Sequence, residues 1–180
     1  MAAQEYAVVN RECAAVQIPE GTPALLSPGT RVRITQSLGG SYTVATERGY
    51  LLRIDEKNAD ALGKAPGATA SALEAGGSLE DRIWTLLKTC YDPEIPVNIV
   101  DLGLVYNCEV RETPEGGRRV DIKMTLTAPG CGMGPVLAQD VKTKVEALPE
   151  VESADVEIVF DPQWNQNMMS EAARLELGLF

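Results

Sequence analysis

The sequence predicts an α+β protein in which a small all-β N-terminal domain precedes a small mixed β-sheet with helices on one face. Three observations support this fold class. Short apolar runs separated by Gly and Pro fill residues 1–63, a stretch rich in Ala and Gly follows at residues 64–78, and residues 79–180 alternate helix-like and strand-like patterns. We therefore predict a small β-rich domain at residues 1–63, a linker at residues 64–78, and an α/β domain with a C-terminal tail at residues 79–180.

The N-terminal range has the short strands and tight turns of a small barrel or sandwich. Gly39 and Gly40 separate two of the strand-like runs, and residues 58–63 predict one helical turn. The expected strands cover residues 6–10, 31–38, 41–46 and 50–54.

The linker is predicted to be flexible because small residues, Pro and Gly dominate residues 64–77. The first helix of the next domain is expected at residues 78–90, where Ser78 and Asp81 have the spacing of a capping box. The prolines of DPEIP, residues 92–96, end that helix.

The rest of the second domain predicts the order strand, strand, helix, strand. A turn at residues 115–117 joins the first two strands into a hairpin, and the next helix allows a parallel crossover to the third strand. The complete order is therefore helix–strand–strand–helix–strand. The last four elements are expected at residues 103–112, 119–127, 135–148 and 151–160.

The charge distribution argues against nucleic acid as a partner. The chain has 16 basic and 26 acidic residues, for a net charge of −10, and an acidic surface repels phosphate backbones. The sequence has no apolar run long enough for a membrane helix and does not start like a secretory signal, so we expect a cytoplasmic protein with no membrane partner. We interpret four arginines as a solvated strand face rather than an anion site: Arg31, Arg33, Arg48 and Arg53.

The cysteine content excludes several kinds of site. The chain has four cysteines, no CxxC pair and no histidine. This excludes the usual Cys/His zinc patterns and any Cys–His or Ser–His catalytic pair within one chain. Cys90 falls on the apolar face of a predicted helix and Cys108 lies inside a predicted strand, so both are predicted to be structural.

Cys131 has different surroundings. It lies in TAPGCGMGP, residues 127–135, between a predicted strand and a predicted helix. The N-terminal end of a helix presents unpaired N–H groups that stabilise a thiolate, which is the form that binds soft metals or attacks electrophiles. The flanking glycines let the backbone approach a bound group closely. We therefore predict a functional rather than a packing role for Cys131.

The segment DPEIPVNIVDLG, residues 92–103, is the second candidate. Asp92 and Glu94 flank a proline, and Asp101 stands near the end of the segment. Two interpretations stay open. The acids form a solvated turn after the helix, or they supply oxygen ligands or a carboxylate close to the thiol.

DPEIPVNIVDLGLVY at residues 92–106, followed by TAPGCGM at residues 127–133, resembles the PaaD-like iron–sulfur cluster assembly domain family. The resemblance spans residues 79–161. Residues 30–44 and 59–63 also resemble family members that have an N-terminal extension, and with them the resemblance covers nearly the whole chain. It implies a non-enzymatic factor in iron–sulfur protein maturation. The implied partners are the assembly machinery and client apoproteins.

By the same resemblance, the reactive cysteine of the family falls on Cys131. This implies a transient iron–sulfur cluster held through Cys131, with no tightly bound cofactor. Gly132 stands where relatives commonly have proline, and Phe160 stands where many have the first of two tryptophans. The other motif positions of the family fall on Asp92, Pro93, Glu94, Thr127 and Pro129.

Three functions stay open at this point. A carrier role predicts a homo-oligomer, most simply a dimer, or ligands from a partner, because one thiolate cannot supply the four that commonly hold a cluster. A metal-free adaptor would dock client proteins, and the amphipathic segment 164–177 is its candidate docking surface, although packing of this segment on its own domain or on a dimer mate is favoured over docking. A thiol-dependent redox enzyme ranks last, because the sequence has no histidine, no CxxC pair and no evident resolving cysteine.

Overall fold

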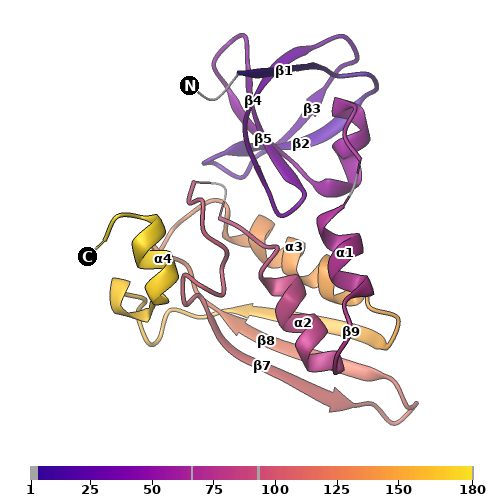
Figure 1. Ribbon diagram of the computed structural model, residues 1–180, viewed down its shortest axis with the longest axis vertical. Helices are drawn as coiled ribbons and strands as arrows, with labels where there is room; N and C mark the ends of the chain where they lie inside the picture. Colours follow the sequence, from indigo (N-terminus) through magenta and orange to yellow (C-terminus); the bar gives the residue numbers. More distant parts are fainter. Residues whose placement is uncertain (1–3, 66, 93, 180) are drawn as a thin grey trace.

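The computed structural model describes residues 4–65, 67–92 and 94–179 and confirms a mixed α+β fold. An all-β N-terminal part stands above a second part built from helices and a smaller sheet (Figure 1). Pro66 of the predicted linker and Pro93 of the DPE motif lie outside the described residues. In the part of the chain that is described, no helix is long and apolar enough to cross a membrane.

The N-terminal domain is one sheet of six antiparallel strands in the order β1-β4-β5-β6-β2-β3. The sequence predicted four of these strands and missed β2 and β3. Strand β2 alternates buried and more exposed residues, but Cys13 and Ala15 on its buried side are small and carry little strand preference. The bounds are β1 Glu5–Val8, β2 Cys13–Ile18, β3 Pro23–Leu26, β4 Arg31–Leu38, β5 Ser41–Thr46 and β6 Leu51–Ile54, followed by the 3₁₀-helix η1 at Glu56–Leu62.

The connection between the domains is helical, so the prediction of a flexible linker over residues 64–78 is wrong for its central part. Helix α1 (Ala68–Glu74) forms there because its alanines have high helix propensity and Ala72 is buried in the core of the second domain. The carboxylate of Glu56 accepts the backbone N–H groups of Gly67 at 2.8 Å and of Thr69 at 3.1 Å. These contacts attach the start of α1 to the N-terminal domain.

The second domain is a three-stranded sheet in the order β7-β8-β9, with β7 antiparallel and β9 parallel to β8. Helices α2 and α3 lie between this sheet and the N-terminal domain (Figure 1). Ser78 caps α2 in a capping box with Asp81, as the sequence predicted. The bounds are α2 Leu79–Leu87, β7 Val105–Glu112, β8 Arg118–Met124, α3 Gly134–Glu146 and β9 Val151–Ile158.

The C-terminal tail packs against its own domain. The indole Nε1 of Trp164 donates to the carbonyl of Leu102 at 2.8 Å, and the N–H of Ser170 donates to the carbonyl of Asp101 at 2.8 Å. Met169 is buried in the core of the second domain. The apolar side of the tail therefore covers this core. The tail contains the 3₁₀-helix η2 at Gln166–Met168 and the helix α4 at Glu171–Glu176.

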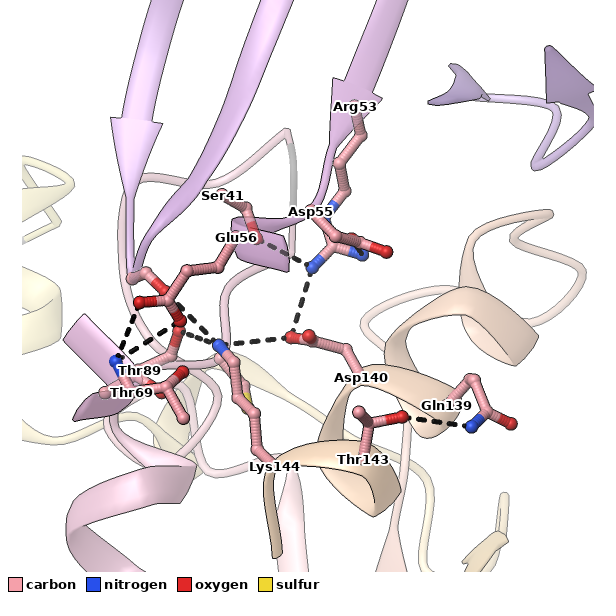
Figure 2. A network of polar contacts seen from close by, with 12 residues as sticks. Ser41, Arg53, Asp55, Glu56, Thr69, Thr89, Gln139, Asp140, Thr143 and Lys144 are labelled. Atoms are coloured by element: carbon pink, nitrogen blue, oxygen red, sulfur yellow. Dashed lines mark hydrogen bonds and ion pairs between the residues drawn. The ribbon is translucent and has the colours of Figure 1, made fainter. Parts of the chain in front are cut away.

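A buried ion network joins the two domains (Figure 2). Arg53 of β6 is 4% exposed, and its Nη2 lies 3.1 Å from Oδ2 of Asp140 on α3. Lys144, 6% exposed, lies 3.4 Å from the same carboxylate oxygen. It also donates to the carbonyls of Thr89 at 2.9 Å and Gly39 at 3.3 Å. Both cations are thus held out of water by groups from both domains.

We predict that Arg53→Met lowers the free energy of unfolding by about 1–3 kcal/mol, because the buried carboxylate of Asp140 loses its cross-domain cation but keeps Lys144 at 3.4 Å. Urea denaturation followed by circular dichroism measures the change. Arg31→Met is the matched control, since Arg31 is an exposed residue of β4 in the same domain. If Arg53→Met lowers the free energy of unfolding no more than Arg31→Met does, the ion network does not hold the two domains together.

Candidate functional site

Cys131 lies at the N-terminal end of α3, as the sequence predicted. The helix begins at Gly134, and Met133 is its N-cap residue. The carbonyl of Cys131 accepts the N–H of Gly134 at 3.2 Å, which folds the loop onto the first turn of the helix. The side chain is half-buried and packs against the core of the second domain. A partly accessible thiol therefore lies in the loop just before the N-terminal end, the positive end of the dipole, of a 13-residue helix.

The other three cysteines have the properties of structural thiols. Cys13 and Cys90 are 0% exposed. Burial raises the pKa of the Cys13 thiol and raises the pKa of the Cys90 thiol to about 12. Cys108 is half-buried in β7, and burial raises its pKa to about 11. None of these thiols has the exposure and charge state that reactivity at neutral pH requires.

Thr127 and Pro129, which precede Cys131 in the chain, line a cleft of about 230 Å³. Phe160 and Trp164 form an aromatic wall of the same cleft. Phe160 is 51% exposed, whereas the indole of Trp164 is fixed by its hydrogen bond to the carbonyl of Leu102. The sequence showed Phe160 in place of the first of two tryptophans that many relatives have. The fold brings Phe160 and Trp164 beside the predicted site residues Thr127 and Pro129.

Asp92 lies at the boundary between the domains. It is 5% exposed, and its carboxylate accepts the N–H of Glu94 at 3.0 Å. It lines a cavity of about 20 Å³ together with Arg53 and Tyr91. Burial raises the pKa of Asp92, while the hydrogen bond from Glu94 and the charge of Arg53 oppose this shift.

The acidic segment thus divides into residues with different surroundings. Asp92 is buried, which rules out a solvated role for this acid, whereas Glu94 is exposed. Asp101 accepts the side-chain amide of Asn98 at 2.7 Å and stabilises the turn before β7. Asp92 and Thr127 line different cavities. Their joint action with Cys131 stays a prediction.

The described residues contain no group of three or more His, Cys, Asp or Glu side chains that could hold a metal ion. Cys131 is therefore not part of such a cluster within the residues that the structure places.

The fold also places a part of the N-terminal domain at the cysteine loop, which the sequence did not predict. The turn between β2 and β3 lies against Gly132, so that a Cβ added to Gly132 would lie 2.4 Å from the carbonyl oxygen of Glu20. A Cβ added to Gly21 would lie 2.1 Å from the carbonyl oxygen of Gly132. This close approach is the physical reason for glycine after Cys131. No sequence signal links two glycines so far apart in the chain.

These features define a two-domain α+β protein with a cysteine loop at the start of a helix. Residues 80–158 match the family model described as "Iron-sulfur cluster assembly protein". The chain is 46% identical over 99 residues to the "Fe-S protein maturation auxiliary factor" of Porphyromonas gingivalis, a match that covers 55% of this chain and 90% of that protein. The chain belongs to this family of iron–sulfur cluster assembly proteins.

The resemblance carried by the two motifs is therefore confirmed. The "Fe-S protein maturation auxiliary factor SufT" of Staphylococcus aureus is 46% identical over 88 residues, which are 49% of this chain and 96% of that protein. The "Fe-S protein maturation auxiliary factor YitW" of Bacillus subtilis is 39% identical over 102 residues, which are 57% of this chain and 96% of that protein. Both matches leave close to half of this chain uncovered, and the family model begins after the N-terminal domain.

We predict that iodoacetamide at about pH 8 labels Cys131 first in the native protein, because Cys13 and Cys90 are fully buried and the pKa of Cys108 is raised to about 11. Peptide mass spectrometry measures the rate at each site. In denaturant all four cysteines should react at similar rates. Native labelling of Cys108 as fast as Cys131 would contradict this assignment.

We predict that Asp92→Asn makes the folded protein more stable at pH 7. A raised pKa in the folded state means that ionised Asp92 costs stability above the ordinary carboxyl pKa of about 3.9, and that the cost disappears as the pH falls below that value. The asparagine keeps an oxygen that accepts the N–H of Glu94. Urea denaturation at pH 7 and at about pH 3.5 should show a gain that shrinks at the lower pH. Glu94→Gln, at an exposed site, should show neither effect.

Proposed function

We propose that this protein is a non-enzymatic factor in the maturation of iron–sulfur proteins and that it carries an iron–sulfur cluster, as cargo, through Cys131. The observation that supports this most is the partly accessible thiol at the N-terminal end of α3, in a chain whose other cysteines are buried or strongly shifted in pKa. The names of its relatives, which are Fe-S protein maturation auxiliary factors, point to the same pathway.

The number of ligands that an iron–sulfur cluster needs determines which partners the proposed carrier requires. Iron–sulfur clusters are commonly held by four thiolates, and Cys131 supplies one per chain. We propose that a second copy of the chain or a partner protein supplies the rest. The partners in this proposal are the assembly machinery that delivers the cluster and the client apoproteins that receive it. A homodimer that pairs two Cys131 thiolates is its simplest form.

The other residues of the two family motifs have supporting roles around the Cys131 loop in this proposal. Thr127 and Pro129 shape the cleft before Cys131, where a segment of a partner would bind. Asp92 is buried and does not face a ligand in solvent, so its role in this proposal is to fix the backbone of Glu94 by accepting its N–H. Glu94, which is exposed, is the acid of this motif that a partner or a cluster would contact.

The alternative function is a metal-free adaptor for client proteins. The tail is a poor docking surface for this role, because Trp164 and Met169 pack against their own domain. The aromatic cleft is a better one, since Phe160 presents a large apolar side chain that is 51% exposed. A thiol enzyme has less support, because Cys13 and Cys90 are too deeply buried to serve as a resolving cysteine.

We predict that Cys131→Ser loses most of the iron that the wild-type protein binds on anaerobic reconstitution, and that client iron–sulfur enzymes lose activity in cells that carry this variant. The physical reason is that the variant lacks the sulfur proposed as the ligand of the cluster. Iron counts with absorbance spectra, and client enzyme assays, measure the two effects. Cys108→Ser is the matched control, since its thiol lies within strand β7.

The same experiment separates the two functions. Equal iron in the Cys131→Ser variant and the wild type refutes the carrier role of this thiol. Full client activity with Cys131→Ser, together with a loss in Phe160→Ala, favours the adaptor. A loss of both iron and client activity in Cys131→Ser alone supports the carrier.

A further inference from the structure

The N-terminal domain touches the second domain at two points where backbone meets backbone. The first is the contact of Gly21 with Gly132 beside Cys131. The second is Gly39, where an added Cβ would lie 1.8 Å from the carbonyl oxygen of Thr89 at the end of α2. Contacts this close leave no room for side chains on either surface, so they fit one orientation of the domains.

Helix α3 runs through this interface. The contact of Gly132 lies just before its first turn, and Asp140 and Lys144 extend from its later turns to Arg53 and to the carbonyl of Gly39. The boundary is tightly packed beside Asp92, where the cavity of about 20 Å³ has room for about one water molecule. The N-terminal domain is therefore docked along α3 and extends to the cysteine loop.

We propose that the N-terminal β domain forms part of the Cys131 site and controls access to its thiol. The turn at residues 19–21 supports the loop at residues 130–133 from one side, and the core of the second domain covers the cysteine from another. A protein that delivers or removes cargo at Cys131 must either contact both domains or displace this turn. The biological purpose of this control of access rests on the proposed function. The accessibility of the Cys131 thiol itself can be measured on the chain without any cluster.

The contacts differ in how much they resist opening. The network of Arg53 and Lys144 is buried, whereas the contact at the turn joins the half-buried Gly21 and the exposed Glu20 to the exposed Gly132. Local opening starts where few buried contacts hold a segment. The turn can therefore move away from Cys131 while the ion network keeps the N-terminal domain attached to α3.

We predict that Gly21→Ala raises the rate at which iodoacetamide alkylates Cys131 in the metal-free protein by about tenfold, because the new Cβ collides with the carbonyl oxygen of Gly132 and displaces the turn. A tenfold change corresponds to about 1.4 kcal/mol of shifted opening equilibrium. Gly29→Ala is the matched control: Gly29 also has a positive φ, +85° against +74° for Gly21, and a Cβ there meets no described atom within 4 Å.

A second pair of variants opens the same contact from the other side. Gly132→Ala collides with the carbonyl of Glu20 without the strain of a left-handed φ. Gly76→Ala is its control, because Gly76 also lacks a left-handed φ and a Cβ there meets no described atom within 4 Å. Gly132→Ala should also raise the alkylation rate, and combining it with Gly21→Ala should add little, because both remove one contact. This pair decides the outcome if Gly21→Ala does not fold.

Rates of both contact variants within twofold of their controls would overturn the proposal. The measurement contains no iron and no client protein, so its result is independent of the carrier role of Cys131. Loss of iron binding in Cys131→Ser with unchanged rates in the glycine variants would leave the carrier role standing and refute control of access by the N-terminal domain.

Discussion

The buried ion network on α3 is the interaction on which the arrangement of this protein depends. Arg53 and Lys144 are almost fully removed from water, and the carboxylate of Asp140 lies between them. Buried charges are tolerated when they are paired and hydrogen-bonded, and a change in the relative position of the two domains would leave them without partners. The network therefore specifies how the N-terminal domain sits on the second domain.

Helix α3 links this network to the candidate site. Its N-terminal end carries the loop with Cys131, its later turns carry Asp140 and Lys144, and its apolar side packs on the small sheet. The same helix is thus shared by the core, by the domain boundary and by the cysteine loop. Asp92 lies at this boundary too, where burial raises its pKa. A carboxylate kept in an unfavourable environment is common at functional sites and less common at purely structural ones.

Periodic patterns predicted the elements that bury one clear face. Strands β4, β7 and β8 alternate in the sequence as they do in the sheets, and Ser78 marked the start of α2. Strands β2 and β3 were missed because small residues and a proline weaken their pattern. Helix α1 was read as a linker because its composition of Ala, Ser and Thr says little about packing, and the contact of Ala72 with the second core settles its structure.

By itself, the sequence determined the mixed α+β class, the family motifs and the position of Cys131 between a strand and a helix, because these depend on local spacing along the chain. Tertiary structure alone decided the burial of Asp92, the packing of the tail on residues 101–103 and the placement of the β2–β3 turn against Gly132. Each of these is a contact between segments distant in sequence. Such contacts are set by the shapes and charges of folded surfaces, which no local pattern records.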